Sequence, residues 1–198
     1  VAPFFKGKDA RALEPLLWEL YRHGDNYKYQ GLALWVCVAA AEFALLDLLG
    51  QVSGRSVADL LGGLKRGEID VYRASGTRGN TPEQEVADLK KIVAESGARA
   101  LKFRLGGRMS RNADVPPDRT VRLIPMVREA FGPDMTLYAD ANSSYDAPEA
   151  IRIGRMMEEY DYAFYEEPCR FDHLEETKAV ADALKIPIAW GEQEFSEE

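Results

Sequence analysis

Three acidic residues recur at one interval in the second half of the chain. Asp140, Glu166 and Glu192 lie 26 residues apart, each at or just past the end of a short apolar run. If these runs are parallel strands, one strand-helix unit apart, the three carboxylates project from the same end of a sheet. Carboxylates brought together repel one another without a cation, and hard oxygen ligands suit Mg²⁺. Singly each acid fits a solvated strand end better, so the predicted metal site rests on the three together.

The sequence does not decide which of two adjacent glutamates faces this site. Glu167 follows Glu166 directly, and successive side chains of a strand point to opposite faces. Either residue is therefore compatible with the pattern.

Two basic residues stand on one face of an earlier apolar segment. Lys102 and Arg104 are two residues apart in Leu-Lys-Phe-Arg-Leu. Charges on an inner strand of a parallel sheet are costly without partners, whereas an exposed strand edge would leave them in water. Because the flanking residues are apolar, we expect the two cations to face the carboxylates and to bind or deprotonate an anionic substrate.

The elements that must position these residues alternate between strand and helix from residue 69 onward. Apolar or alternating runs predict strands, and the amphipathic stretches between them predict helices. Asp172 with Glu175 is a plausible capping box for the last helix. The predicted strands are 69–74, 98–105, 136–140, 163–166 and 187–191, and the predicted helices are 82–96, 118–131, 148–158 and 174–184.

This alternation predicts a parallel sheet built from βαβ units. An open doubly wound sheet and a (β/α)₈ barrel both satisfy it. Only about five strands fit before residue 198, so a barrel would be incomplete.

Residues 1 to about 62 are predicted to be helical. An amphipathic helix follows Asp9, and a short helix is expected at 56–61. The run 32–49 is apolar around much of its circumference, which predicts packing on several sides. Because Glu42 and Asp47 interrupt it, we interpret it as a buried helix and not as a membrane span.

Composition and charge exclude several classes of protein. The chain has 198 residues, 46% hydrophobic and 29% charged, with a net charge of −8 and a pI near 5.0. This balance is typical of a globular protein and disfavours nucleic acid or an anionic membrane as partner. Cys37 and Cys169 are isolated, which indicates neither zinc nor a disulfide framework and favours a cytoplasmic protein.

Taken in order, the charged motifs resemble those of the mandelate racemase/muconate lactonising branch of the enolase superfamily. The family pattern is Lys-x-Lys, Asp-x-Asn, Glu-Glu-Pro or Glu-Gln-Pro, then Gly-Glu or Gly-Asp. The stretch 44–63 also resembles the helical end of the family's capping domain. The matching motifs in this chain are Lys-Phe-Arg, Asp-Ala-Asn, Glu-Glu-Pro and Gly-Glu-Gln.

The resemblance implies a ligand set for magnesium. Asp140, Glu166 and Glu192 would bind Mg²⁺, with Glu167 beside them, and Asn142 would support the site.

The resemblance also implies roles for the two cations. Lys102 matches the lysine that neutralises the substrate carboxylate, and Arg104 stands where many relatives carry a second lysine that acts as the base. Arginine stays protonated near neutral pH, so Arg104 is a poor base but a strong partner for a carboxylate or hydroxyl group. In sugar-acid dehydratases of the family a later His-Asp pair takes the proton. Neither His23, at a predicted helix end, nor His173 is assigned that role.

By resemblance the chain is an α/β protein. Residues 67–198 are expected to form the first part, about five βα units, of a modified TIM (β/α) barrel. Residues 1–66 are expected to be the C-terminal helical part of an α+β capping domain. We expect these 198 residues alone to have little activity, because an incomplete barrel exposes two sheet edges and lacks part of the acid/base set.

The implied reaction is Mg²⁺-dependent removal of the proton α to a substrate carboxylate, through an enediolate. The polar side chains of Lys102, Arg104 and Asn142 suit a hydroxylated substrate, which favours dehydration of a sugar acid. The rivals are racemisation or epimerisation, cycloisomerisation of a diacid and, from another class, a non-catalytic α/β metal-binding or structural domain. The partner expected is a small carboxylate, and the oligomeric state stays open, a homo-oligomer included.

Overall fold

The computed structural model describes residues 1–29 and 31–195 and divides into two compact units. Unit 1 comprises Val1–Ile69 and the residues after Gln193, and unit 2 comprises Asp70–Gln193. Residues 196–198, the end of the range expected to be barrel, lie outside the described residues. Each unit is considered by itself.

Unit 1 is helical, as the sequence predicts. Three short 3₁₀ segments surround its α-helices, and Asp9 caps the second of these segments by accepting a hydrogen bond from the backbone N–H of Arg11. The helix α3 begins with a capping box between Ser56 and Asp59. The elements are η1 (Ala2–Phe5), η2 (Ala10–Ala12), α1 (Leu13–Arg22), η3 (His23–Lys28), α2 (Leu32–Ser53) and α3 (Val57–Leu60).

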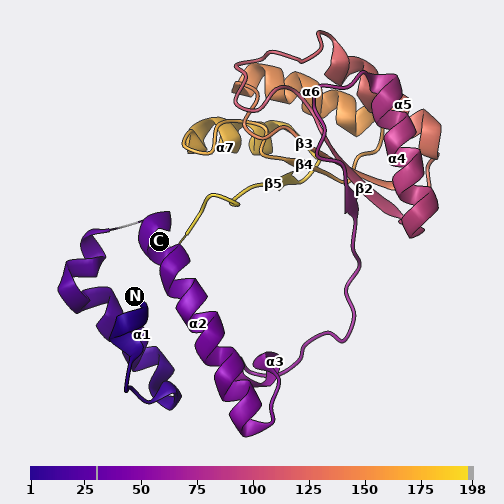
Figure 1. Cartoon of the computed structure of the whole chain (residues 1–198). Coiled ribbons are helices and arrows are strands. Elements are labelled where there is room, and N and C mark those ends of the chain that lie inside the picture. Colours follow the sequence, from indigo (N-terminus) through magenta and orange to yellow (C-terminus); the bar gives the residue numbers. More distant parts are fainter. Residues whose placement is uncertain (30, 196–198) are drawn as a thin grey trace. The chain divides into compact units, whose positions relative to one another are not determined.

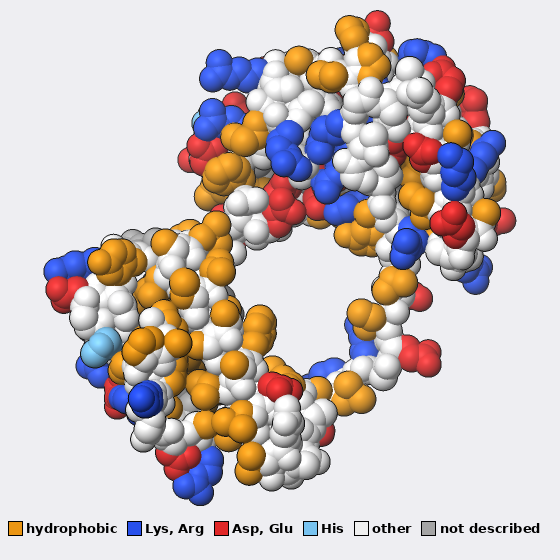
Figure 2. Space-filling model, in the orientation of Figure 1, with side chains coloured by type: hydrophobic (Ala, Val, Ile, Leu, Met, Phe, Trp, Pro, Cys, Tyr) orange, Lys and Arg blue, Asp and Glu red, His pale blue; other side chains and the backbone are white. Residues whose placement is uncertain are grey.

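The expectation that α2 packs on several sides is wrong for the part of the chain that the structure describes. Only four of its residues are buried, and Leu20 of α1 packs against two of them in a small core. The other elements of unit 1 are too few and too short to surround a 22-residue helix. By length and composition α2 could cross a membrane, which is weak evidence by itself. Figure 2 shows hydrophobic side chains gathered over this unit; the exposed ones on α2 are Leu32, Val36, Phe43, Leu48 and Val52.

Unit 2 contains a five-stranded sheet in which every neighbouring pair is parallel. The order β1-β2-β3-β4-β5 follows the chain without reversal. The strand order of a doubly wound sheet reverses at a switch point. The consecutive order seen here therefore excludes the doubly wound alternative and fits the incomplete (β/α) barrel. The strands are β1 (Arg73–Ala74), β2 (Ala100–Arg104), β3 (Thr136–Asp140), β4 (Phe164–Glu166) and β5 (Ile188–Ala189).

The predicted helices of unit 2 are confirmed, and every predicted end lies within one residue of the observed end. Capping explains one of the starts: Thr81 and Gln84 form a capping box, and Pro82 occupies the first turn. The predicted capping box of Asp172 with Glu175 is wrong, because Asp172 pairs with Arg170 and no side chain caps that helix. The helices are α4 (Pro82–Ser96), α5 (Arg119–Phe131), α6 (Ala147–Glu159) and α7 (Leu174–Ala183).

The first and last strands are shorter than predicted. Each has two residues, whereas the sequence pattern covers 69–74 and 187–191. Both lie at an edge of the sheet, where a strand pairs on one side only. An apolar run without a second neighbour has fewer backbone partners to hold it extended.

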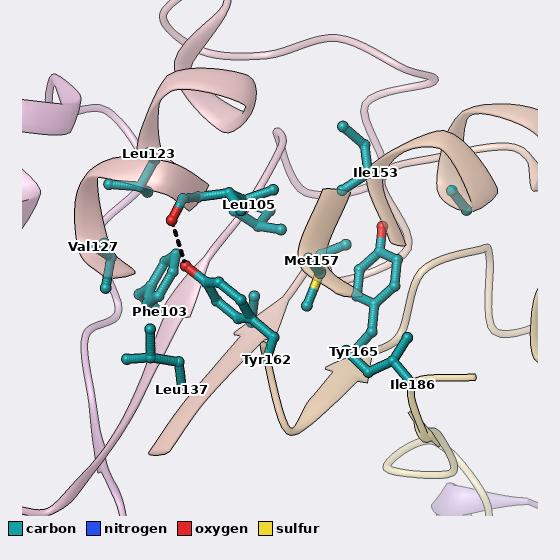
Figure 3. Packing of buried hydrophobic residues seen from close by; sticks show 14 of the residues in the cluster. Phe103, Leu105, Leu123, Val127, Leu137, Ile153, Met157, Tyr162, Tyr165 and Ile186 are labelled. Carbon is teal, nitrogen blue, oxygen red and sulfur yellow. Dashed lines mark hydrogen bonds between the residues drawn. The ribbon is translucent and has the colours of Figure 1, made fainter. Parts of the chain in front are cut away.

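The helices cover one face of the sheet, in chain order (Figure 1). Beneath them lies the core, to which alternate residues of the central strands contribute: Leu101 and Phe103 from β2, Leu137 from β3 and Tyr165 from β4, all fully buried. Figure 3 shows this packing, with the Tyr162 hydroxyl donating to the carbonyl of Ile124 at 2.9 Å. The intervening residues therefore point to the opposite face, and these include Lys102, Arg104, Asp140 and Glu166.

Candidate active site at the carboxyl ends of the strands

The strand register places three predicted site residues in one row. Arg104 pairs in register with Asp140, and Asp140 pairs with Glu166. Each is the last residue of its strand, so their side chains meet on the helix-free face at the carboxyl edge of the sheet. In open and closed α/β sheets, this edge is where ligands bind.

Two cations of β2 face two carboxylates of β3 and β4. Lys102 Nζ lies 2.5 Å from Glu166 Oε2 and 3.7 Å from Asp140 Oδ2. Arg104 forms an ion pair with Asp140 Oδ2. The Lys102 side chain is 9% exposed and that of Asp140 is fully buried, so the charges are removed from water and depend on one another. The expectation that Lys102 and Arg104 face the carboxylates is met.

Asn142 links the acids and the cations at the end of β3. Its backbone N–H donates to Asp140 Oδ1 at 2.8 Å, and its side-chain Oδ1 accepts from Arg104 at 3.1 Å. Its φ of 40° turns the chain sharply after the strand. The turn brings an amide group back over the carboxylate two residues earlier.

Both adjacent glutamates reach this edge. Glu166 contacts Lys102, while Glu167 has a φ of 42° and leaves the strand alternation, so that its side chain accepts from Asn142 Nδ2 at 3.3 Å. Burial raises the pKa of Glu167, and the negative charges of Glu192 and Glu166 raise it further. A backbone turn in the left-handed region resolves the ambiguity in the sequence, which assumed that strand alternation continues.

Glu192, the third predicted ligand, lies at the same edge of the sheet. It is exposed and follows β5. It lines a depression of about 170 Å³ together with Glu166 and Glu167. A second cavity, of about 330 Å³, is lined by Glu192 and Glu167 and also by Arg104 and Arg108.

The groups at this edge fit a divalent metal ion in their chemistry but not in their present spacing. Among the residues described, no three acidic, histidine or cysteine side chains lie close enough together to hold one. The donor chemistry nevertheless fits Mg²⁺, because the side chains of Asp140, Asn142, Glu166, Glu167 and Glu192 offer carboxylate or amide oxygens. Among the described residues Glu167 Oε1 is buried without a hydrogen-bond donor, and such an oxygen is well suited to a cation.

Two arginines at this edge were not among the site residues predicted from the sequence. Arg78 donates to Asn142 Oδ1 at 2.7 Å, and Arg108 lines the 330 Å³ cavity. Both stand in loops that follow predicted strands, in Thr-Arg-Gly and Gly-Arg-Met. The rule that selected Asp140 and Glu166, a charged residue just past a strand, would have found them if it had been applied to loops as well.

A buried arginine fixes the loop that carries Arg78. Arg119 is inaccessible to solvent and lies 3.5 Å from Glu85 Oε2. It donates to the carbonyl of Asn80 at 2.9 Å, to Asn80 Oδ1 at 2.9 Å and to the carbonyl of Arg104 at 2.8 Å. The loop after β1 is thereby tied to the end of β2.

Comparison with known proteins agrees with this architecture. The family described as enolase C-terminal domain-like matches residues 84–198. A crystal structure of a mandelate racemase/muconate lactonizing protein from Paracoccus denitrificans, complexed with magnesium, is 30% identical with a TM-score of 0.87; the match covers 97% of this chain and 51% of that one.

Two curated relatives are sugar-acid dehydratases. The L-talarate/galactarate dehydratase of Salmonella typhimurium is 30% identical over 97% of this chain and 46% of its own length. The D-galactonate dehydratase of Pectobacterium atrosepticum is 31% identical over 99% of this chain and 50% of its own. The chain spans about half the length of these relatives.

The parallel sheet, its charged carboxyl edge and the family match together define the class. The chain belongs to the enolase C-terminal domain-like family, within the mandelate racemase/muconate lactonising group of the enolase superfamily.

Proposed function

We propose that the protein containing this chain is a Mg²⁺-dependent enzyme that removes the proton α to a substrate carboxylate and dehydrates a sugar acid. One observation carries the proposal: Lys102 and Arg104 face Asp140 and Glu166 at the carboxyl edge of a parallel sheet. Buried charges of both signs are costly as mere structure, so their concentration at a ligand-binding edge favours a catalytic role.

Asp140, Glu166 and Glu192 would hold the metal, with Asn142 and Glu167 supporting them. When bound, the ion would make the α-proton of the substrate more acidic by withdrawing electrons from its carboxylate. Because no three acidic side chains among the described residues lie close enough together to hold an ion, side chains must shift for the three carboxylates to share one. Glu192 is exposed after a two-residue strand, which is compatible with such a shift.

Lys102 and Arg104 would act on the substrate directly. Lys102 would neutralise the substrate carboxylate and favour the extra negative charge of the enediolate. Arg104 is fixed by Asp140 and Asn142, and a guanidinium group is a poor base, so it would bind a carboxylate or hydroxyl group and not act as base. The base would then be supplied by another residue of the complete enzyme.

The proposed domain organisation follows the family. Residues 1–66 would be the C-terminal helical part of a capping domain, and 67–198 the first part of the barrel. In the cytoplasm, the location proposed, the isolated thiols of Cys37 and Cys169 would stay reduced.

Dehydration is preferred to racemisation, epimerisation and cycloisomerisation because both curated relatives named above are dehydratases. The reactions are separable by product. A dehydratase yields a 2-keto-3-deoxy acid that a carbonyl reagent detects, whereas a racemase or epimerase exchanges the α-proton with solvent deuterium and returns no carbonyl product.

Metal binding tests the proposal against a non-catalytic domain. The protein, expressed with any residues that flank this chain in its gene, is titrated with Mg²⁺ calorimetrically and then assayed with a panel of sugar acids. We expect Mg²⁺ binding that weakens at least tenfold in Glu166→Gln and Glu192→Gln, together with Mg²⁺-dependent turnover. Equal Mg²⁺ affinity in all three proteins and no turnover would contradict the proposal and favour a non-catalytic domain.

A further inference from the structure

The loops after β1 and β2 bring two unpaired arginines to the site. Among the described residues, no carboxylate lies within ion-pair distance of Arg78 or Arg108, although the chain as a whole is acidic. Arg78 and Arg104 instead share one neutral acceptor, Asn142 Oδ1, at 2.7 and 3.1 Å. Arg104 also pairs with the Asp140 carboxylate. Guanidinium groups bind carboxylates more strongly than amides, so it is Arg78 that lacks its best partner among the described residues.

The cluster is held in place at a cost. Burial, together with the positive charges of Arg104, Arg108 and Arg119, lowers the pKa of Arg78 to about 10. Its Nε is buried and has no acceptor among the described residues. The buried contacts of Arg119 with Asn80 nevertheless fix this loop against the end of β2. Arginines that are held close together by other buried contacts, in spite of their mutual repulsion, indicate an anion-binding position.

The neighbouring cavity is lined by charges of both signs. Glu167 and Glu192 make up the acidic pole of its lining, and Arg104 and Arg108 make up the basic pole. Its volume of about 330 Å³ is near the lower end of the roughly 300–1,000 Å³ that small-molecule sites occupy. A metal at the acidic pole would bind one carboxylate of a substrate, which leaves the basic pole for a second anionic group.

We infer that Arg78 and Arg108, with Arg104, form a subsite for a second carboxylate, and that the substrate is a dicarboxylic sugar acid (an aldarate). The inference rests on the proposed function, because it assumes that the other carboxylate is activated at the acidic pole. A monocarboxylic sugar acid (an aldonate) ends in a neutral hydroxymethyl group and would leave Arg78 and Arg108 without a counter-charge.

Matched pairs of substrates test the inference. The Mg²⁺-loaded enzyme is assayed with five- and six-carbon aldarates and with the aldonates that differ from them only at the far carbon. Product carbonyl and α-proton exchange in D₂O are both measured. We expect kcat/KM for the best aldarate to exceed that of its aldonate by at least about tenfold, the ratio that one charge-assisted hydrogen bond gives.

Two variants and a control locate the effect. Arg108 is exposed and unpaired, so Arg108→Met should leave the fold intact. We expect it, and Arg78→Met separately, to lower the aldarate-to-aldonate ratio about tenfold, chiefly by raising KM for the aldarate. Arg111→Met is the control, since Arg111 is exposed on the same loop as Arg108 but lines a different hollow; it should not change the ratio.

The outcomes separate this inference from the proposed function. Turnover of aldonates in preference to aldarates, or a ratio that neither arginine variant changes, overturns the inference and leaves the proposed function standing. Neither product nor α-proton exchange with any sugar acid in the panel overturns both.

Discussion

The two faces of the sheet are built from alternate residues of the same strands, yet they are stabilised in different ways. On β2, Leu101 and Phe103 enter an apolar core under the helices, while Lys102 and Arg104 meet carboxylates on the opposite face. Apolar packing tolerates any residue of similar volume, whereas the charged face depends on particular pairs. The covered face therefore holds the fold, and the charged face is available for chemistry.

The largest effect is expected on the charged face. Glu166→Gln keeps the size of the side chain but removes the charge that faces Lys102, and we expect turnover to fall by about 10³-fold, as for other losses of a charge-stabilising group. Stability should change less than turnover, because Lys102 keeps Asp140 as a partner. Glu95→Gln, on the exposed side of α4, is the matched control and should leave turnover unchanged. Steady-state kinetics and thermal melting check both statements.

A truncation on the covered face should lower the stability of the protein more than its turnover. Phe103 is fully buried and contacts Tyr162 edge to face, so Phe103→Ala should destabilise the protein by about 3–5 kcal/mol through lost burial and a cavity. The molecules that stay folded should retain most of their turnover. A urea denaturation midpoint within error of wild type would contradict the separation of the two faces.

The helices that cover the core should contribute smaller increments. Thr81→Ala removes the side-chain acceptor at the start of α4 and should cost about 1 kcal/mol. Thr81→Ser retains the hydroxyl and should restore most of the loss. Equal stability of the two variants would show that the capping box contributes nothing.

The last expected effect is a pH dependence, which is confined to alkaline pH. Burial raises the pKa of the Cys169 thiol to about 12 from an ordinary value of 9.0. Between these values the unfolded chain has lost the proton that the folded chain keeps, so stability falls as pH rises from about 9 to 12. Cys169→Ala should remove up to one proton from this dependence, about 1.4 kcal/mol per pH unit. Denaturant unfolding of both proteins at pH 8 and pH 10 measures the difference, and identical slopes would contradict it.

Much of the fold could be predicted because its signals are local. Hydrophobic periodicity gives β3 and α4 to the residue, since strand and helix periods differ and Thr81 and Pro82 mark a helix start. The ends of the edge strands could not be predicted, because pairing with a neighbour decides where β1 and β5 stop. The exposure of α2 also escaped prediction, since an apolar helix gives no information on how many neighbours surround it.

The candidate site was predictable in part for the same reason. The positions of Lys102, Arg104, Asp140 and Glu166 follow from strand alternation and a parallel order. Arg78 could not be placed by periodicity, because it lies in a loop whose path is set by distant contacts of Arg119.

The sequence by itself determined the kind of elements, their order and the set of charges at the strand ends, because these follow from residue type and from spacing along the chain. Only the tertiary structure decided that both Glu166 and Glu167 reach the site, that Glu192 shares a depression with them and that Arg78 joins Arg104 at Asn142. These outcomes depend on left-handed turns after strands and on buried contacts between residues far apart in the chain. No local pattern records such contacts, since their energies arise only when the chain is folded.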